Sequence, residues 1–413
     1  MSSSFRAAAA GVFSVALIGL SAAHIGAQTV TRADQATEAR AQKAGDLQTH
    51  QRSMIERVLF KLEDDLLLER LFASPRGIYV RLGGVGESSG FGLGPAYRYN
   101  TAAFDFKTTA AVSIKKYSVV EASIRFPGTL GQDAYIKSLG PYVDLQGRRR
   151  DLPQEDYFGL GPASELAARS NYARTDVFGG ATGGVAWDRV KAGVSVGYLD
   201  VLTGSGEDSR MPSSEDVLPP DQLLGFGEEP SFLTVEPFLE ITMRDRAKGE
   251  KSGGVYRVSA AQFDDRTLGR YSFRRWEADL RQFIGFQKDT RSLALRAWAA
   301  ATTPAGGSEM PFYMQPTLGG ANTLRGYRLF RFRDRSALLL QTEYRWRINE
   351  FVSGALFYDT GAVAPTLKDL GRLERNYGFG LRAGGRLGSA FRFDVALGGR
   401  EGIRYLLRFD DVF

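Results

Sequence analysis

Residues 336–348 read SALLLQTEYRWRI and alternate between apolar and polar side chains. Leu340 and Tyr344 fall on one face of an extended chain, whereas Glu343 and Arg345 fall on the other. This period of two residues predicts a β-strand that has one apolar face and one polar face.

The same alternation recurs from residue 77 to the end of the 413-residue chain. The polar faces are rich in glycine and in charges of both signs, and the apolar faces carry aromatic residues near the strand ends. This pattern is typical of a transmembrane β-barrel with a wet lumen, and less so of a soluble sandwich. We therefore expect an all-β fold, a 16-stranded antiparallel transmembrane β-barrel, with an even strand number as bacterial barrels have. The expected strands are 77–85, 89–100, 103–113, 116–126, 137–149, 170–187, 190–200, 232–244, 252–262, 270–285, 290–300, 336–348, 351–361, 375–387, 390–398 and 404–413.

The connections between these strands support the count. The four longest are 150–169, 201–231, 301–335 and 362–374, and each joins an odd-numbered strand to the next even-numbered one. Long connections at one end and short turns at the other are expected of an outer-membrane barrel with external loops.

The N-terminal segment has the features of an exported protein. Residues 1–27 contain one early charge, an apolar stretch and small residues before Gln28, which predicts a cleaved signal peptide; a membrane anchor is the alternative. Residues 28–76 form a predicted periplasmic segment, and 51–73 have apolar residues at helical spacing. This short helix is expected to pack on the barrel mouth, or else to act as a plug or a partner-binding element.

The composition excludes several classes of function. The chain has no cysteine, and its two histidines, His24 and His50, lie in the first 50 residues, so we expect no metal site, no cofactor and no enzyme activity. The net charge is +6, but Lys and Arg form one tight run only, Arg148 to Arg150. We therefore expect no binding of nucleic acid.

Two motifs carry a family resemblance. Leu324-Arg325-Gly326-Tyr327 lies in the loop 301–335, and residues 357–361 read FYDTG. These resemble the loop signature and the FxDxG strand motif of the BamA/TamA superfamily of outer-membrane assembly factors, also called bacterial surface antigens. The resemblance implies that Arg325 at the loop tip enters the lumen and meets Asp359 and Glu343, with Gly361 completing the strand motif.

The chemistry of these residues agrees with such an anchor. Alternation places Glu343 on the polar face of its strand, and an arginine can donate to two carboxylates at once and remains charged. Gly326 is expected to allow a tight turn at the tip, beside Tyr327.

The C-terminal residues suggest a recognition signal. Tyr405, Leu407, Phe409 and the final residue, Phe413, share one face. They resemble the β-signal by which the assembly machinery recognises barrel substrates.

The resemblance also implies a function. The segment 28–76 is too short for a typical polypeptide-transport-associated (POTRA) module, so we expect a barrel-only member, with residues 77–413 forming the surface antigen domain. We expect an outer-membrane protein that assists insertion or translocation, with a loop locked by Arg325; a passive pore or structural barrel is the alternative. The partners implied are outer-membrane lipids, the barrel-assembly machinery, and unfolded outer-membrane or secreted proteins.

Overall fold

The computed structural model describes residues 76–83, 85, 89–128, 136–243, 252–287, 290–349, 352–385 and 388–408. The predicted signal peptide at 1–27 and the predicted helix at 51–73 lie outside these residues.

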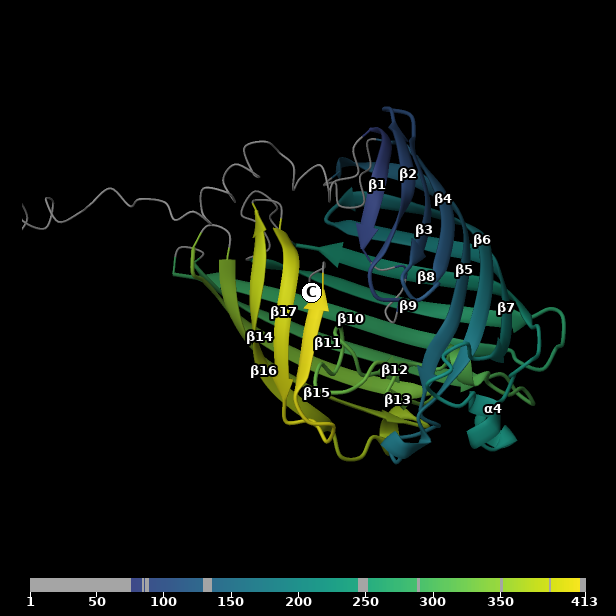
Figure 1. Cartoon of the computed structure of the whole chain (residues 1–413). Coiled ribbons are helices and arrows are strands. Elements are labelled where there is room, and N and C mark those ends of the chain that lie inside the picture. The colour runs from purple at the N-terminus through teal and green to yellow at the C-terminus, as the bar shows by residue number, and fades with distance from the viewer. Residues whose placement is uncertain are drawn as a thin grey trace, which may run out of the picture. The chain divides into compact units, whose positions relative to one another are not determined.

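The fold is one sheet of sixteen antiparallel strands, arranged in the order of the sequence (Figure 1). The all-β fold and the strand number predicted from the alternation are therefore confirmed. Among the described residues, β1 pairs with β2 and β18 pairs with β17, and no ladder joins β1 to β18. The strands are β1 (Gly77–Gly83), β2 (Gly92–Asn100), β3 (Asp105–Ser113), β4 (Ser118–Phe126), β5 (Ile136–Tyr157), β6 (Ser170–Asp188), β7 (Val190–Ser205), β8 (Ser231–Thr242), β9 (Gly253–Asp265), β10 (Phe273–Phe286), β11 (Arg291–Pro304), β14 (Ser336–Arg347), β15 (Val352–Ala364), β16 (Glu374–Gly385), β17 (Gly388–Leu397) and β18 (Arg404–Arg408).

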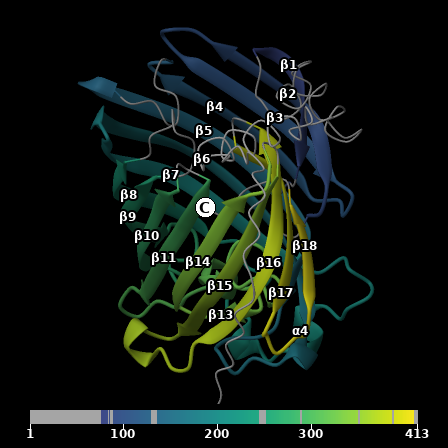
Figure 2. The same ribbon diagram turned by 90° about the vertical axis from the view of Figure 1, so that its left-hand side faces the viewer.

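The sheet curves strongly, and the long connections gather at one end of it (Figures 1 and 2). We call this the loop end, and it carries α4 (Ser214–Val217) and the short strands β12 (Thr317–Leu318) and β13 (Phe332–Arg333). The opposite end has tighter connections, such as the single residue Arg189 between β6 and β7. No helix in the described part of the chain is long and apolar enough to cross a membrane.

Strand β5 extends eight residues beyond its predicted end at 149 and reaches Tyr157. Its register with β6 shifts between Leu152 and Glu155, so the alternation changes phase at a bulge. A search for unbroken alternation ends before such a shift, which explains why the sequence predicted a loop there.

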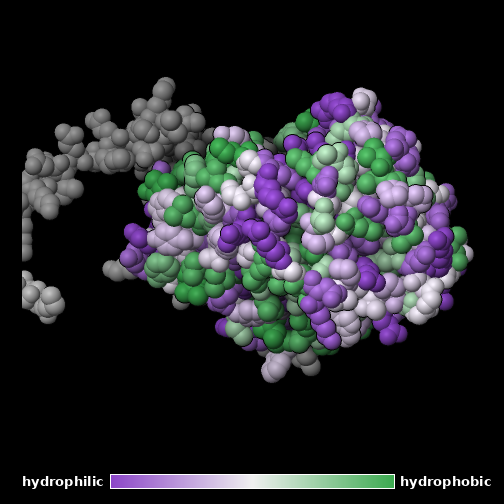
Figure 3. Space-filling model, turned by 90° about the horizontal axis from the view of Figure 1, so that it is seen from below, coloured by the Kyte–Doolittle hydropathy of each residue, from purple (hydrophilic) through white to green (hydrophobic). Residues whose placement is uncertain are grey.

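Apolar side chains cover the outer face of the sheet. Val143, Val177, Leu340 and Phe379 are examples of large apolar residues that remain exposed. Polar residues of the opposite parity face inward, as expected for a barrel that meets lipid on its outside. Seen from the loop end, by contrast, hydrophilic and hydrophobic residues are interspersed (Figure 3).

Two of the apolar clusters pack the long loops inside the loop end. The larger one is aromatic and joins the long loops to the ends of the strands; it includes Tyr157, Tyr172, Phe232, Phe273 and Phe312. The smaller one packs Leu318, Leu324, Tyr327 and Phe332 of the loop 305–335 against Ala337, Leu339 and Val363 of β14 and β15. The loop between β11 and β14 is thus held against the inner face of the sheet.

Candidate functional site

The site centres on Arg325, at the tip of the loop between β11 and β14. Strands β12 and β13 pair with each other at the base of this loop, through Thr317 with Arg333 and Leu318 with Phe332. The smaller apolar cluster holds the segment between them against β14 and β15. This packing brings the Arg325 guanidinium to the inner face of the sheet.

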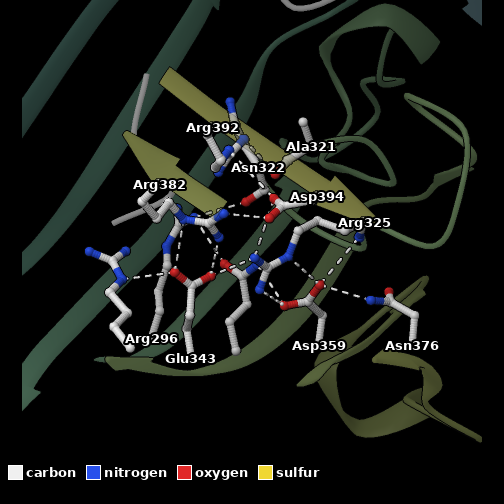
Figure 4. A network of polar contacts seen from close by, with 12 residues as sticks. Arg296, Ala321, Asn322, Arg325, Glu343, Asp359, Asn376, Arg382, Arg392 and Asp394 are labelled. Carbon is white, nitrogen blue, oxygen red and sulfur yellow. Dashed lines mark hydrogen bonds and ion pairs between the residues drawn. The ribbon is translucent and has the colours of Figure 1, made fainter. Parts of the chain in front are cut away.

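Arg325 donates to two carboxylates on neighbouring strands (Figure 4). Its Nε and Nη2 donate to the two Asp359 carboxylate oxygens at 2.8 and 2.7 Å, and Nη1 donates to Glu343 Oε2 at 2.6 Å. All three side chains are fully buried. The guanidinium carbon also lies 3.5 Å from the centre of the Phe357 ring, a stacking contact that suits a planar cation.

Neighbouring side chains donate further hydrogen bonds to the Asp359 carboxylate. Gln341 on β14 donates to Oδ1 at 3.1 Å, and Asn376 on β16 donates to Oδ2 at 2.9 Å. The backbone N–H of Arg325 also points at Oδ2, at 3.4 Å. A buried carboxylate with this many donors fixes the geometry of the groups around it.

Sequence reasoning missed the second half of the site, which lies on β16 and β17. Arg382 Nη2 donates to Glu343 at 2.8 Å, and Arg382 Nη1 donates to Asp394 at 2.5 Å. Asp394 in turn lies 3.7 Å from Arg325 Nη1. Arg325, Glu343, Arg382 and Asp394 therefore form a ring of alternating charge. We call this ring, together with Asp359, the lock.

Two further arginines border the lock. Arg345 Nε donates to Glu343 Oε1 at 2.8 Å. Arg392 Nη2 donates to the Ala321 carbonyl at 3.1 Å and to Asn322 Oδ1 at 3.2 Å, so β17 also holds the loop tip by its backbone. Alternation in the sequence places Arg382, Arg392 and Asp394 on polar faces, but the register that sets Arg382 opposite Arg392 is known only from the structure.

The glycines of the two motifs allow close approach. The tip does turn tightly at Gly326, where the Tyr327 N–H donates to the Leu324 carbonyl at 3.0 Å, although the φ of Gly326 is not positive. In addition, a Cβ at Gly326 would lie 2.5 Å from Asn376 Cβ. A Cβ at Gly361 would likewise lie 2.5 Å from the Leu338 carbonyl oxygen. Both positions exclude side chains for reasons of space.

Tyr327 and its neighbours connect the loop to the last strands. The Tyr327 hydroxyl donates to Glu374 at 2.6 Å, and the Arg328 N–H donates to Glu401 at 2.9 Å. Burial, reinforced by the Glu374 carboxylate, raises the pKa of Tyr327 to about 12, so its hydroxyl remains a donor. Both Arg325 and Tyr327 therefore fix the loop tip.

The structure describes two of the four residues of the expected β-signal. Tyr405 and Leu407 lie on β18 and are exposed on the outer, apolar face. Phe409 and Phe413 lie outside the described residues.

The site makes ion pairs and hydrogen bonds, and its geometry is suited to holding a loop. In the described part of the chain, no group of three or more His, Cys, Asp or Glu side chains is placed to hold a metal ion. The carboxylates of the lock are occupied by arginines instead.

Comparisons with known proteins agree with this architecture. The model of the Omp85 superfamily domain matches residues 148–401, more than half of the chain. BamA from Haemophilus ducreyi lacking POTRA domains 1-3 aligns with a TM-score of 0.56 at 13% identity, over 81% of this chain and 70% of that one. CdiB from Escherichia coli aligns with a TM-score of 0.47 at 13% identity, over 83% and 67%. No curated protein matches the sequence. On the match of its domain, the chain belongs to the Omp85 superfamily and is a β-barrel protein of the bacterial outer membrane.

Proposed function

We propose that this protein assists the insertion or translocation of polypeptides at the outer membrane, and that the loop 305–335 is the element whose position controls the lumen. Membership of the Omp85 superfamily supports the first part. The second part rests on one observation: a fully buried arginine joins the loop to acids on β14 and β15.

The chemistry of the lock favours a held loop over an incidental contact. Leaving one charge of a buried ion pair without its partner typically costs about 3–5 kcal/mol. The loop tip is therefore stable in one position, and the lumen's cross-section depends on that position. A client that displaces the tip would have to offer comparable contacts to Arg325, Glu343 and Asp359.

The alternative is a passive pore or a structural barrel that handles no client. It would keep the same lock, because a fixed loop also narrows a pore. The two functions differ in whether the protein changes the fate of another polypeptide.

A reconstitution experiment distinguishes them. The purified protein is placed in lipid vesicles, and a urea-unfolded outer-membrane barrel is added while its folding is followed by gel mobility without heating. We expect faster folding of the client than in empty vesicles. Unchanged folding, together with ion conductance in a planar bilayer, would contradict the proposal and favour the passive pore.

Arg325→Lys is the informative variant in this assay. A lysine retains the charge, but it cannot form the two-bond contact with Asp359 and reach Glu343 as well. We expect it to alter client folding while the barrel still assembles. Arg375→Lys, on an exposed position of β16, is the matched control.

A further inference from the structure

The arginine run on β5 separates into two faces. Arg149 is exposed and stands between Val120 of β4 and Val177 of β6, which belong to the apolar exterior. Arg148 and Arg150 have the opposite parity, so they project from the inner face of the sheet. The lock does not use these two residues, and neither motif includes them.

Three guanidinium groups share one carboxylate at this position. Arg150 donates to Asp176 through Nε and Nη2, the shortest contact being 2.8 Å. Arg174 and Arg148 lie 3.7 and 3.9 Å from the same carboxylate. The Asp176 side chain is only 3% exposed, whereas Arg148 and Arg150 are 37% and 30% exposed. Asp176 is thus covered, whereas Arg148 and Arg150 are partly exposed beside it. Glu121 of β4 stands opposite Arg148 with its side chain 40% exposed, but it pairs with Arg81 at 2.6 Å, so cations outnumber exposed acids on this surface.

The same construction recurs on β2 and β3. Arg98 donates to both oxygens of Asp105 at 2.9 and 3.0 Å, and Lys107 lies 3.5 Å from it. Asp105 is 5% exposed, but Arg98 and Lys107 are 28% and 33% exposed. We call Arg98, Lys107, Arg148 and Arg150, with the two covered acids, the basic wall.

The basic wall faces the same space as the loop. Arg174, which neighbours Asp176, donates to the Tyr313 carbonyl in the loop at 3.4 Å. Asp176 of the wall is therefore linked through Arg174 to the loop that the lock holds.

The spacing of the cations indicates the shape of the ligand. Arg148 and Arg150 are two residues apart on one strand, which corresponds to about 6–7 Å. Alternate side chains of an extended polypeptide have the same spacing, so two acidic residues separated by one position could meet both arginines. Charges spread over β2, β3 and β5 suit an extended anionic chain better than one small anion in a pocket.

We propose that the basic wall is a binding surface for extended, acidic polypeptide segments. This rests on the proposed function, because it names the class of client that the lumen favours. Opposite charges on wall and client attract at long range, and salt weakens that attraction.

The test measures binding of a labelled decaglutamate peptide to the purified full chain in a non-ionic detergent, by fluorescence anisotropy at low salt. We expect decaglutamate to bind and decalysine to bind at least tenfold more weakly. Equal binding of the two peptides, or tighter binding of decalysine, would overturn the proposal.

Variants locate the binding. Arg148→Gln removes an exposed cation but leaves Arg150 on Asp176, so the barrel keeps its fold. We expect Arg148→Gln to weaken decaglutamate binding about two- to fivefold, and we expect the same of Lys107→Gln. Arg149→Gln, on the outer face of the same strand, should leave binding unchanged. An equal loss from Arg149→Gln and Arg148→Gln would overturn the proposal.

The outcome is separable from that of the proposed function. If decaglutamate binds and the variants behave as expected while client folding is unchanged, the basic wall stands and the assembly function fails. If client folding is accelerated but decaglutamate does not bind, the basic wall alone is wrong.

Discussion

The lock on β14–β17 and the basic wall on β2–β6 both place arginines and acids on the inner face of the sheet. They differ in how far the charged side chains are exposed to solvent. In the lock, the side chains of Arg325, Glu343, Asp359 and Asp394 are fully buried. In the basic wall the acids are covered, whereas Arg148 and Lys107 remain about one-third exposed. Buried pairs hold structure, because separating them is costly, whereas exposed cations contribute little to stability and are available to a ligand.

The largest effect should follow from breaking the lock at its centre. Arg325→Ala leaves Glu343 and Asp359 buried without their shared cation, and we expect the barrel to lose about 3–5 kcal/mol of stability. The measurement is the temperature at which the unheated gel form converts to the unfolded form. Arg375→Ala is the control, on an exposed position of β16. A conversion temperature equal to that of the control would show that the lock does not stabilise the loop.

A smaller effect is expected at the far side of the ring. Asp394→Asn keeps an acceptor for Arg382 but removes the charge that Arg382 and Arg325 share. We expect a loss of about 1.5–3 kcal/mol, less than that of Asp359→Asn, because Asp359 accepts two bonds from Arg325. The same gel assay applies, with Asp200→Asn on an exposed position of β7 as control. A larger loss from Asp394→Asn would place the centre of the lock on β17 instead.

The strands could be predicted from the sequence because alternation is a local property of the chain. Glu343 and Asp359 could be assigned to the polar face for the same reason. Arg382 and Asp394 are also on polar faces, but their pairing depends on register: Asp394 stands opposite Gly380, whose missing side chain leaves room for the Asp394 carboxylate. No local pattern reveals such diagonal contacts.

The loop interior was beyond sequence reasoning for a different reason. Strands β12 and β13 have two residues each, too short for a period to be detected. The turn at Gly326 could be predicted, but its close approach to Asn376 could not, because that approach depends on tertiary packing. Contacts of this kind become visible only when distant segments are placed together.

A third prediction concerns the loop end, where Arg331 joins two parts of the chain. Its Nη1 and Nη2 donate to Ser164 Oγ and O at 2.7 and 2.6 Å, and its Nε lies 2.7 Å from Glu401. Arg331 thus links the β5–β6 connection to the β17–β18 connection. No ladder joins β1 to β18 among the described residues, so side-chain contacts of this kind hold the two parts of the sheet near each other. We expect a coupling of about 0.5–3 kcal/mol between Arg331→Gln and Glu401→Gln in a double-mutant cycle.

The cycle uses the conversion temperature of the two single variants and of the double variant. If the losses simply add, Arg331 and Glu401 act independently and the loop end is held by the aromatic cluster alone. The pair Arg372→Gln and Glu401→Gln serves as the uncoupled reference, since Arg372 is exposed in the β15–β16 connection.

The smallest effect on stability is expected in the basic wall, and it tests the comparison most directly. Arg148 lies 3.9 Å from Asp176 and is 37% exposed, so Arg148→Gln should change stability by less than about 0.5 kcal/mol. High salt should then separate the two regions. In 1 M KCl the Debye length falls to about 3 Å, so decaglutamate binding at the wall should be lost while the conversion temperature set by the buried lock changes little. A lock as salt-sensitive as the wall would mean that water reaches Arg325, and that the two regions differ in degree only. A wall whose binding survives 1 M KCl would mean that decaglutamate is held by contacts other than the exposed cations.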